Sequence, residues 1–187
     1  SMTIIETITK EFSGNIDTSM ADRKKHSTDA SLFEVLPEVV VYPKNVKDIE
    51  TLVRHISAEK KNNPKISLTA RAAGTCMSGG SLSESVVMDV TKYFTRIGAV
   101  DPLSKTIVVE PGVYYRDMEK KTLAQNLVLA SYTASKDLCA VGGMVANNAG
   151  GERSIKYGST RSFVKRLRVV LANGEVIEAR QLNKREL

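Results

Sequence analysis

The chain has 187 residues, of which 42% are hydrophobic and 26% charged, values that are typical of a globular protein and exclude a disordered one. No apolar run approaches the ~20 residues of a membrane-spanning helix, and the N-terminus lacks the features of a secretory signal, so we expect neither a membrane span nor secretion. The net charge of +6 suits an anionic ligand, but the basic residues are dispersed with few aromatic residues between them, so we expect no nucleic-acid partner.

The first 36 residues are expected to form an N-terminal helix and a polar, irregular arm, and residues 37–187 the main domain. Thr3 and Glu6 have the spacing of a capping box, and apolar residues follow at helical intervals up to Gly14. Residues 14–36 show no regular pattern, which predicts an arm that wraps the domain.

A strand–helix–strand unit opens the main domain. The run EVVVYPKN predicts a buried strand that Pro43 stops, and Asn45 can cap a helix that reaches about Lys61. KISLTA, residues 65–70, predicts the next strand. Such a unit favours a parallel pair of strands joined by a right-handed crossover.

The second half of the chain mixes strands with short helices. SVVMDV predicts a strand, and residues 95–113 predict two strands around a turn at Asp101–Ser104. Residues 114–126 predict a helix and LVLA, residues 127–130, a short strand. Residues 164–179 predict a hairpin with a two-residue turn at Asn173-Gly174, in which Leu167, Val169 and Leu171 form the buried face. The fold class is therefore α+β.

The loop RAAGTCMSGGSL, residues 71–82, follows a predicted strand and is rich in small residues. It has the glycine spacing of a nucleotide-hydrolysing phosphate loop, but Gly80 stands where that loop needs lysine. It also fails as a dinucleotide fingerprint, because Cys76 occupies the position of the second glycine. Its exposable N–H groups suit a phosphate or diphosphate; a mobile loop that binds nothing is the equal alternative.

A second small-residue segment, residues 139–162, contains Gly142-Gly143 and Gly150-Gly151 around Asn147 and Asn148. A loop of this length is unusual unless it is functional or disordered, and Met144 and Ile155 disfavour disorder. Two such loops in one domain predict a long ligand that lies across both.

These motifs, in this order, resemble the FAD-binding domain of the vanillyl-alcohol-oxidase/PCMH superfamily, and specifically its D-lactate dehydrogenase/glycolate oxidase branch. The resemblance covers about residues 30–180 and is carried by VVVYPKNVKDIETLV, LTARAAGTCMSGG, VVMDVTKYFTRIGAVDPLSKTIVVEPGV and CAVGGMVANNAGGERSIKYGSTRSFVKRLRVVLANGEVI. It implies a PCMH-type domain of two lobes: a small parallel βαβ lobe, and a mixed or antiparallel sheet lobe flanked by helices.

The resemblance also implies which residues hold the cofactor. The FAD diphosphate would be cradled by the first loop, through Arg71, Ala72, Ala73, Gly74, Thr75, Cys76, Ser78 and Gly79. The flavin would lie beside a turn formed by Glu110, Pro111 and Gly112. The ribityl chain and ring would be lined by the second segment, through Ser135, Cys139, Gly142, Gly143, Ala146, Asn148, Gly150 and Tyr157, and the adenine would lie near Val176 and Ile177 on the last strand.

The resemblance implies non-covalent FAD, because Thr75 stands where covalently flavinylated relatives carry histidine. Asp89 matches a family aspartate, although its position at a strand end favours the capping of a turn. Cys76 and Cys139 belong to no CxxC pair, so we expect neither a metal site nor a disulfide. We therefore expect a reduced, cytoplasmic protein, or one that is peripheral at the inner membrane through other subunits.

The implied reaction is the oxidation of a 2-hydroxy acid such as D-lactate or glycolate by hydride transfer to flavin N5, with an unidentified electron acceptor. The chain ends at Leu187, before the family's substrate domain, so we expect a fragment that holds no catalytic residue, is inactive alone and retains FAD weakly or in part. Two alternatives remain open: an FAD-dependent sugar or aldonolactone oxidase of the same fold, and a non-catalytic nucleotide-binding or basic interaction module.

Overall fold

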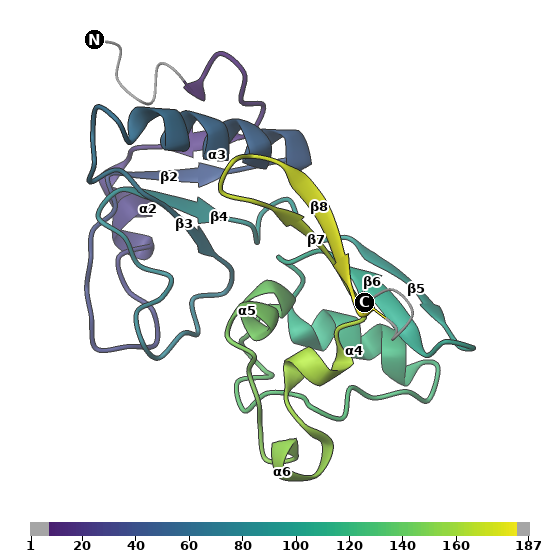
Figure 1. The fold of residues 1–187 in the computed structure, drawn as a ribbon. Coiled ribbons are helices and arrows are strands. Elements are labelled where there is room, and N and C mark those ends of the chain that lie inside the picture. The colour runs from purple at the N-terminus through teal and green to yellow at the C-terminus, as the bar shows by residue number, and fades with distance from the viewer. Residues whose placement is uncertain (1–7, 183–187) are drawn as a thin grey trace.

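The computed structural model describes residues 8–182, which form two lobes with a hairpin packed beside them (Figure 1). Thr3 and Glu6, the predicted capping box, lie outside the described residues. Ile8 and Phe12 are buried in the core of the first lobe, so the start of the described chain is part of that lobe.

The first lobe is built on a four-stranded sheet in the order β1-β2-β4-β3. Its strands are β1 (Asn15–Asp17), β2 (Val39–Tyr42), β3 (Leu68–Arg71) and β4 (Val86–Asp89). β2 and β3 both run parallel to β4, and Val86 lies in register with Val39 on one side and Leu68 on the other. The predicted parallel orientation of β2 and β3 is therefore confirmed, but the two strands do not pair with each other. Every residue of β4 is buried, which favours a central place in the sheet, and β4 separates the two predicted partners.

Helix α3 (Val46–Glu59) covers one face of this sheet, as Figure 1 shows. The Asn45 side chain accepts a hydrogen bond from the Asp48 N–H at 2.9 Å, which confirms the predicted cap. Leu52 and Ile56 of α3 are buried against the sheet in the main core cluster. The members of that cluster are Ile8, Phe12, Val39, Val41, Leu52, Ile56, Ile66, Val86, Met88, Val90 and Phe94.

The arm over residues 14–36 is more ordered than predicted. It contains β1, which pairs antiparallel with β2, and the helix α2 (Met20–Lys25), whose first turn is capped by the Ser19 side chain. Both elements are short, and β1 is only partly buried, so neither leaves a periodic pattern in the sequence.

The second lobe consists of a β-ribbon with a helix packed on it. The strands β5 (Ile97–Asp101) and β6 (Thr106–Val109) are antiparallel, as predicted, and α4 (Tyr115–Leu123) buries Tyr115 and Met118 against them. The predicted strand over residues 127–130 is absent. Instead Asn126 adopts φ +56° and the Leu127 N–H bonds the Thr122 carbonyl, which terminates α4.

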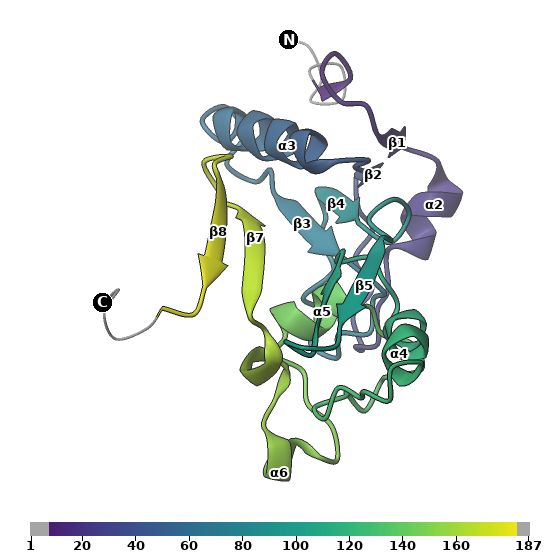
Figure 2. The same cartoon turned by 90° about the vertical axis from the view of Figure 1, so that its right-hand side faces the viewer.

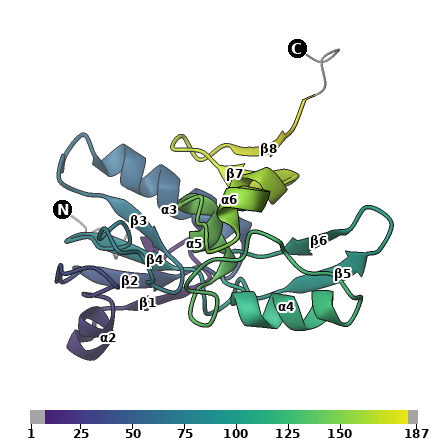
Figure 3. The same ribbon diagram turned by 90° about the horizontal axis from the view of Figure 1, so that it is seen from below.

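Three short helices follow, where the sequence showed no periodicity. They are α5 (Val141–Ala146), α6 (Ser154–Tyr157) and the 3-10 helix η1 (Thr160–Phe163). Figure 3 shows α5 between the two lobes, with the four-stranded sheet on one side and β5, β6 and α4 on the other.

The chain then forms a hairpin of β7 (Arg166–Val170) and β8 (Val176–Arg180) beside α3 (Figure 2). The hairpin is confirmed, but its turn has three residues, because the Leu171 N–H pairs with the Glu175 carbonyl and Gly174 adopts φ +80°. The predicted buried face is also wrong. Leu167 is 37% exposed and no residue of β7 or β8 is fully buried, because the hairpin packs on the molecule mainly through its turn, where Arg54 bonds the Gly174 carbonyl.

Candidate functional site

The loop that follows β3 wraps around the side chain of its own first residue, Arg71. Gly74 has φ +69°, and a Cβ at this position would lie 2.4 Å from a guanidinium nitrogen of Arg71. The guanidinium donates to the Thr28 carbonyl at 2.8 Å, and more weakly to the His26 carbonyl at 3.5 Å. Arg71 is thus used inside the protein to fix the loop against the N-terminal arm.

The turn over residues 72–75 leaves its backbone donors without partners. Throughout residues 8–182, the N–H groups of these four residues meet no hydrogen-bond acceptor. Small side chains, from Ala72 to Thr75, leave the backbone accessible. Successive free N–H groups around a residue with positive φ form a concave site for an anion, so the donor set fits a diphosphate.

The second segment meets the first loop at α5. A Cβ on Gly143 would lie 3.9 Å from the Ala72 Cβ. The Asn147 side chain is also near enough to contribute to lowering the pKa of the Cys76 thiol. The structure therefore brings the two small-residue segments together, although Ala72 and Gly143 are 71 positions apart in the sequence (143 − 72), and the views from two sides agree (Figures 1 and 3).

The turn at residues 110–112 supports α5. The Gly142 N–H donates to the Pro111 carbonyl at 2.8 Å, and a Cβ on Gly142 would lie 2.7 Å from that of Pro111. Only glycine permits this close approach of backbone to backbone. The Glu110 carboxylate does not face the loops, because it accepts hydrogen bonds from the Arg96 side chain and backbone.

A cavity of about 500 Å³ opens beside the first loop, between the two lobes. Three parts of the chain line it: the N-terminal arm, the first loop, and residues near the start of the second segment. They are Lys25, Thr28, Asp29 and Ala30; Arg71, Ala73, Gly74 and Thr75; and Tyr114, Asp137 and Leu138. An elongated ligand could lie across both lobes here.

The remaining predicted site residues lie outside this cavity. Ser135 and Cys139 are in the approach to α5, where the buried Cys139 thiol contacts the Thr133 hydroxyl at 3.3 Å. Ala146 ends α5, and Gly150 contacts the Ser154 hydroxyl. Asn148 caps the start of η1 by accepting from the Ser159 hydroxyl and the Arg161 N–H.

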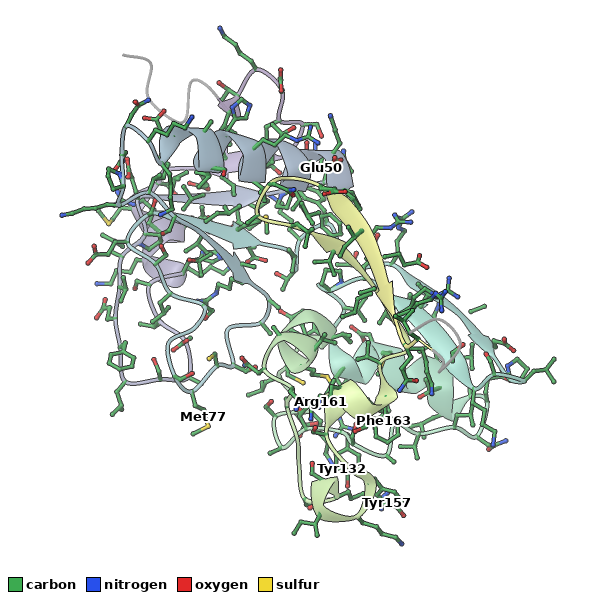
Figure 4. The ribbon with its side chains drawn as sticks, viewed as in Figure 1. Glu50, Met77, Tyr132, Tyr157, Arg161 and Phe163 are labelled. Atoms are coloured by element: carbon green, nitrogen blue, oxygen red, sulfur yellow. The ribbon has the colours of Figure 1, made fainter. Side chains whose placement is uncertain are left out.

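Three predicted residues lie on α6 and β8. Tyr157 ends α6, at the tip of the second lobe, and Figure 4 shows it well away from Met77 of the first loop. Val176 and Ile177 lie on β8, each 36% exposed.

The N-terminal arm is the part of the site that sequence reasoning missed. Thr28 and Asp29 line the cavity, and His26, with 1% of its surface exposed, lies behind it. Their segment reads as polar and irregular, so no periodic pattern could have indicated it. The only local signal is a run of small polar residues, HSTDAS.

Hydrogen bonds decide the charge of the acids and the thiol around the loop. Burial raises the pKa of Asp29, but bonds from Ser31 and Ser81 and the nearby Arg71 outweigh it, so the pKa falls below its usual value. The pKa of the Cys76 thiol is lowered by hydrogen bonds from the Ser78 side chain and backbone, with smaller contributions from Gly80 and Asn147. Burial lowers the pKa of Arg71, partly offset by Asp89 and Asp29.

Asp89, at the end of β4, caps a turn as its position predicted. Its Oδ1 accepts from the Thr91 N–H at 2.7 Å and from the Thr91 hydroxyl at 2.6 Å, and its Oδ2 faces the His26 ring at 2.9 Å.

Comparison with known proteins places the chain in a family. The model of a family described as "FAD binding domain" matches residues 37–180. The chain is 30% identical over 174 residues to D-2-hydroxyglutarate dehydrogenase of Haemophilus influenzae, covering 93% of this chain and 17% of the relative. It is 32% identical over 165 residues to glycolate oxidase subunit GlcD of Bacillus subtilis, covering 87% of this chain and 34% of the relative. The chain thus spans from a sixth to a third of the length of these relatives.

The fold agrees with this match. A solved structure of alkyldihydroxyacetonephosphate synthase superposes with a TM-score of 0.77 and 20% identity, over 95% of this chain and 38% of that one. The α+β class and the PCMH-type architecture are confirmed. The relatives include the glycolate oxidase branch that the motifs predicted. The protein belongs to the family of FAD-binding domains, and FAD is its cofactor.

Proposed function

We propose that the turn over residues 72–75 binds the FAD diphosphate without a covalent link, as the cofactor site of a dehydrogenase that oxidises a small 2-hydroxy acid. The observation that carries the site is the set of free N–H groups beside the cavity. The names of the relatives support the substrate class: D-2-hydroxyglutarate dehydrogenase, glycolate oxidase subunit and D-lactate dehydrogenase all act on hydroxy acids.

In this proposal the chain binds and orients, and it supplies no catalytic base. The main-chain donors of the first loop neutralise diphosphate charge, and α5 with the turn at residues 110–112 holds the second side of the site. The other residues that the resemblance assigns to the cofactor lie between Ser135 and Ile177 in the sequence, and they are proposed to contact the rest of the FAD molecule. Bound FAD supplies a two-electron acceptor for a hydride.

The organisation around this site is also proposed. The family match begins at residue 37, which supports a domain over residues 37–187 preceded by the arm of residues 1–36. We propose a cytoplasmic protein, supported by the free thiols of Cys76 and Cys139. No helix within residues 8–182 has the length and apolar character to cross a bilayer. A 2-hydroxy acid and an electron acceptor are the proposed partners, both engaged outside this chain.

The test is an FAD titration of the purified protein, followed by flavin fluorescence and absorbance. Ala73→Asp places a carboxylate among the free N–H groups and should raise the Kd for FAD by at least about tenfold, or ~1.4 kcal/mol. Ala99→Asp, on the exposed strand β5, is the matched control and should leave the Kd unchanged. Equal Kd values for the two variants would refute the assignment of the loop.

The substrate class is tested by reduction of an artificial electron-acceptor dye with D-2-hydroxyglutarate, D-lactate or glycolate, in the full-length enzyme that contains this chain. Turnover of one of these acids supports the proposal. Turnover of a sugar or lactone alone would assign the domain to a sugar oxidase. A colourless protein with steeply salt-dependent DNA binding would instead indicate a basic interaction module.

A further inference from the structure

A buried histidine joins the N-terminal arm to the sheet. His26 Nδ1 lies 2.8 Å from the Asp22 carbonyl, and His26 Nε2 lies 2.9 Å from Asp89 Oδ2. Asp89 is the last residue of β4, 63 positions away in the sequence. The ring is 1% exposed and packs edge-on against Tyr42, whose hydroxyl donates to the Asp22 carboxylate at 2.6 Å.

Both ring nitrogens of His26 face oxygens that accept. A backbone carbonyl and an ionised carboxylate can only accept a hydrogen bond, so the ring binds both oxygens through its nitrogens. Burial raises the pKa of Asp89, but the hydrogen bonds from His26 and Thr91 outweigh it and hold that pKa below its usual value. Asp22 also has a carboxylate oxygen 3.7 Å from His26 Nδ1.

The same short segment holds the first loop. The carbonyl groups of His26 and Thr28 accept hydrogen bonds from the Arg71 guanidinium, which fixes the start of the loop. The Asp29 carboxylate accepts a hydrogen bond from the Ser81 hydroxyl at 3.1 Å, which fixes the end of the loop. Residues 26–29 thus hold both ends of the segment that presents the free N–H groups.

We propose that His26 is a positioning residue for cofactor binding: anchored to Asp89, it fixes the carbonyl groups of residues 26–28 so that Arg71 holds the turn at residues 72–75 in its binding conformation. The inference rests on the proposed binding of the diphosphate at that turn. His26 makes no hydrogen bond to residues 72–75 within the described chain, so its effect on the turn passes through the bonds of its segment to Arg71 and Ser81.

Two matched substitutions separate its two hydrogen bonds. In His26→Gln the side-chain amide reaches the position of Nε2 and can still donate to Asp89. In His26→Asn the shorter amide reaches only the position of Nδ1 and loses Asp89. His55→Asn is the control, because His55 lies partly exposed on α3, where its Nε2 is 3.7 Å from the Glu11 carboxylate.

The readout is the Kd for FAD, measured by flavin fluorescence, with far-UV circular dichroism to confirm folding. His26→Asn should raise the Kd about ten- to a hundredfold, the equivalent of one lost charged hydrogen bond, while His26→Gln and His55→Asn stay within about threefold of wild type. Ser81→Ala removes the hydrogen bond from Ser81 to Asp29 and should raise the Kd for FAD severalfold, which provides a test independent of His26.

Wild-type affinity in a folded His26→Asn variant overturns the inference, as does an equal loss in His26→Gln. The wild-type protein is titrated first, so that absence of FAD binding there refutes the proposed function, whereas tight wild-type binding with an unchanged His26→Asn affinity refutes this inference alone.

Discussion

Gly74→Ala tests the geometry of the first loop most directly. Gly74 has φ +69°, a region in which a side chain is strained, and the new Cβ would lie 2.4 Å from a nitrogen and 2.8 Å from the central carbon of the Arg71 guanidinium. Arg71 cannot simply swing away, because it donates to the Thr28 carbonyl at 2.8 Å. The methyl group therefore either strains the loop or breaks the tie to the arm.

The cost follows from these two effects. A non-glycine residue with left-handed backbone angles costs ~1–2 kcal/mol. A lost hydrogen bond from a charged group costs ~1.5–3 kcal/mol, although Arg71 regains part of this from water. We expect Gly74→Ala to lower the free energy of unfolding by about 3 kcal/mol, and to raise the Kd for FAD because the free N–H groups move.

Urea denaturation and FAD titration check both numbers. The control is Gly80→Ala in the same loop, where φ is not positive and the new Cβ would meet only the Cys76 sulfur, at 3.3 Å; it should cost less than about 0.5 kcal/mol. In an Arg71→Ala background Gly74→Ala should cost only the ~1–2 kcal/mol of backbone strain, since the clash is gone. Equal unfolding free energies for Gly74→Ala and Gly80→Ala would refute the reasoning.

Two further predictions concern the core and the pH dependence of stability. Leu52→Ala, at a position with no exposed surface, should lower the free energy of unfolding by ~2–5 kcal/mol in urea denaturation, whereas Val108→Ala, 80% exposed on β6, should change it by less than ~0.5 kcal/mol. Asp89 has a pKa below its ordinary value of 3.8 in the folded protein, so its ionised form stabilises the fold at neutral pH, and this contribution is lost as the pH falls through about 4 and below. The stability difference between wild type and Asp89→Asn should therefore shrink from pH 7 towards pH 3; a difference that grows would contradict the paired carboxylate.

Local features were readable from the sequence because neighbouring residues create them. Asn45 caps α3 through a bond to the N–H three residues on, and the turn at Asp101–Ser104 is closed by bonds from residues 103 and 104 to the Asp101 carboxylate. The apolar runs of β2 and β4 identify both as buried strands. The order of the small-residue motifs identified the family, and with it the cofactor.

Tertiary structure alone decided which of these elements meet. β4 separates β2 from β3, and the strand predicted at residues 127–130 is replaced by the end of α4, because pairing depends on partners distant in the chain. His26 pairs with Asp89 across 63 residues, and Arg71 reaches Thr28 across 43. No local pattern encodes such contacts, since a buried polar side chain is satisfied by whichever acceptor the fold brings to it. The sequence alone therefore predicted a phosphate-binding loop after β3, whereas the folded chain decided that the N-terminal arm holds this loop in place.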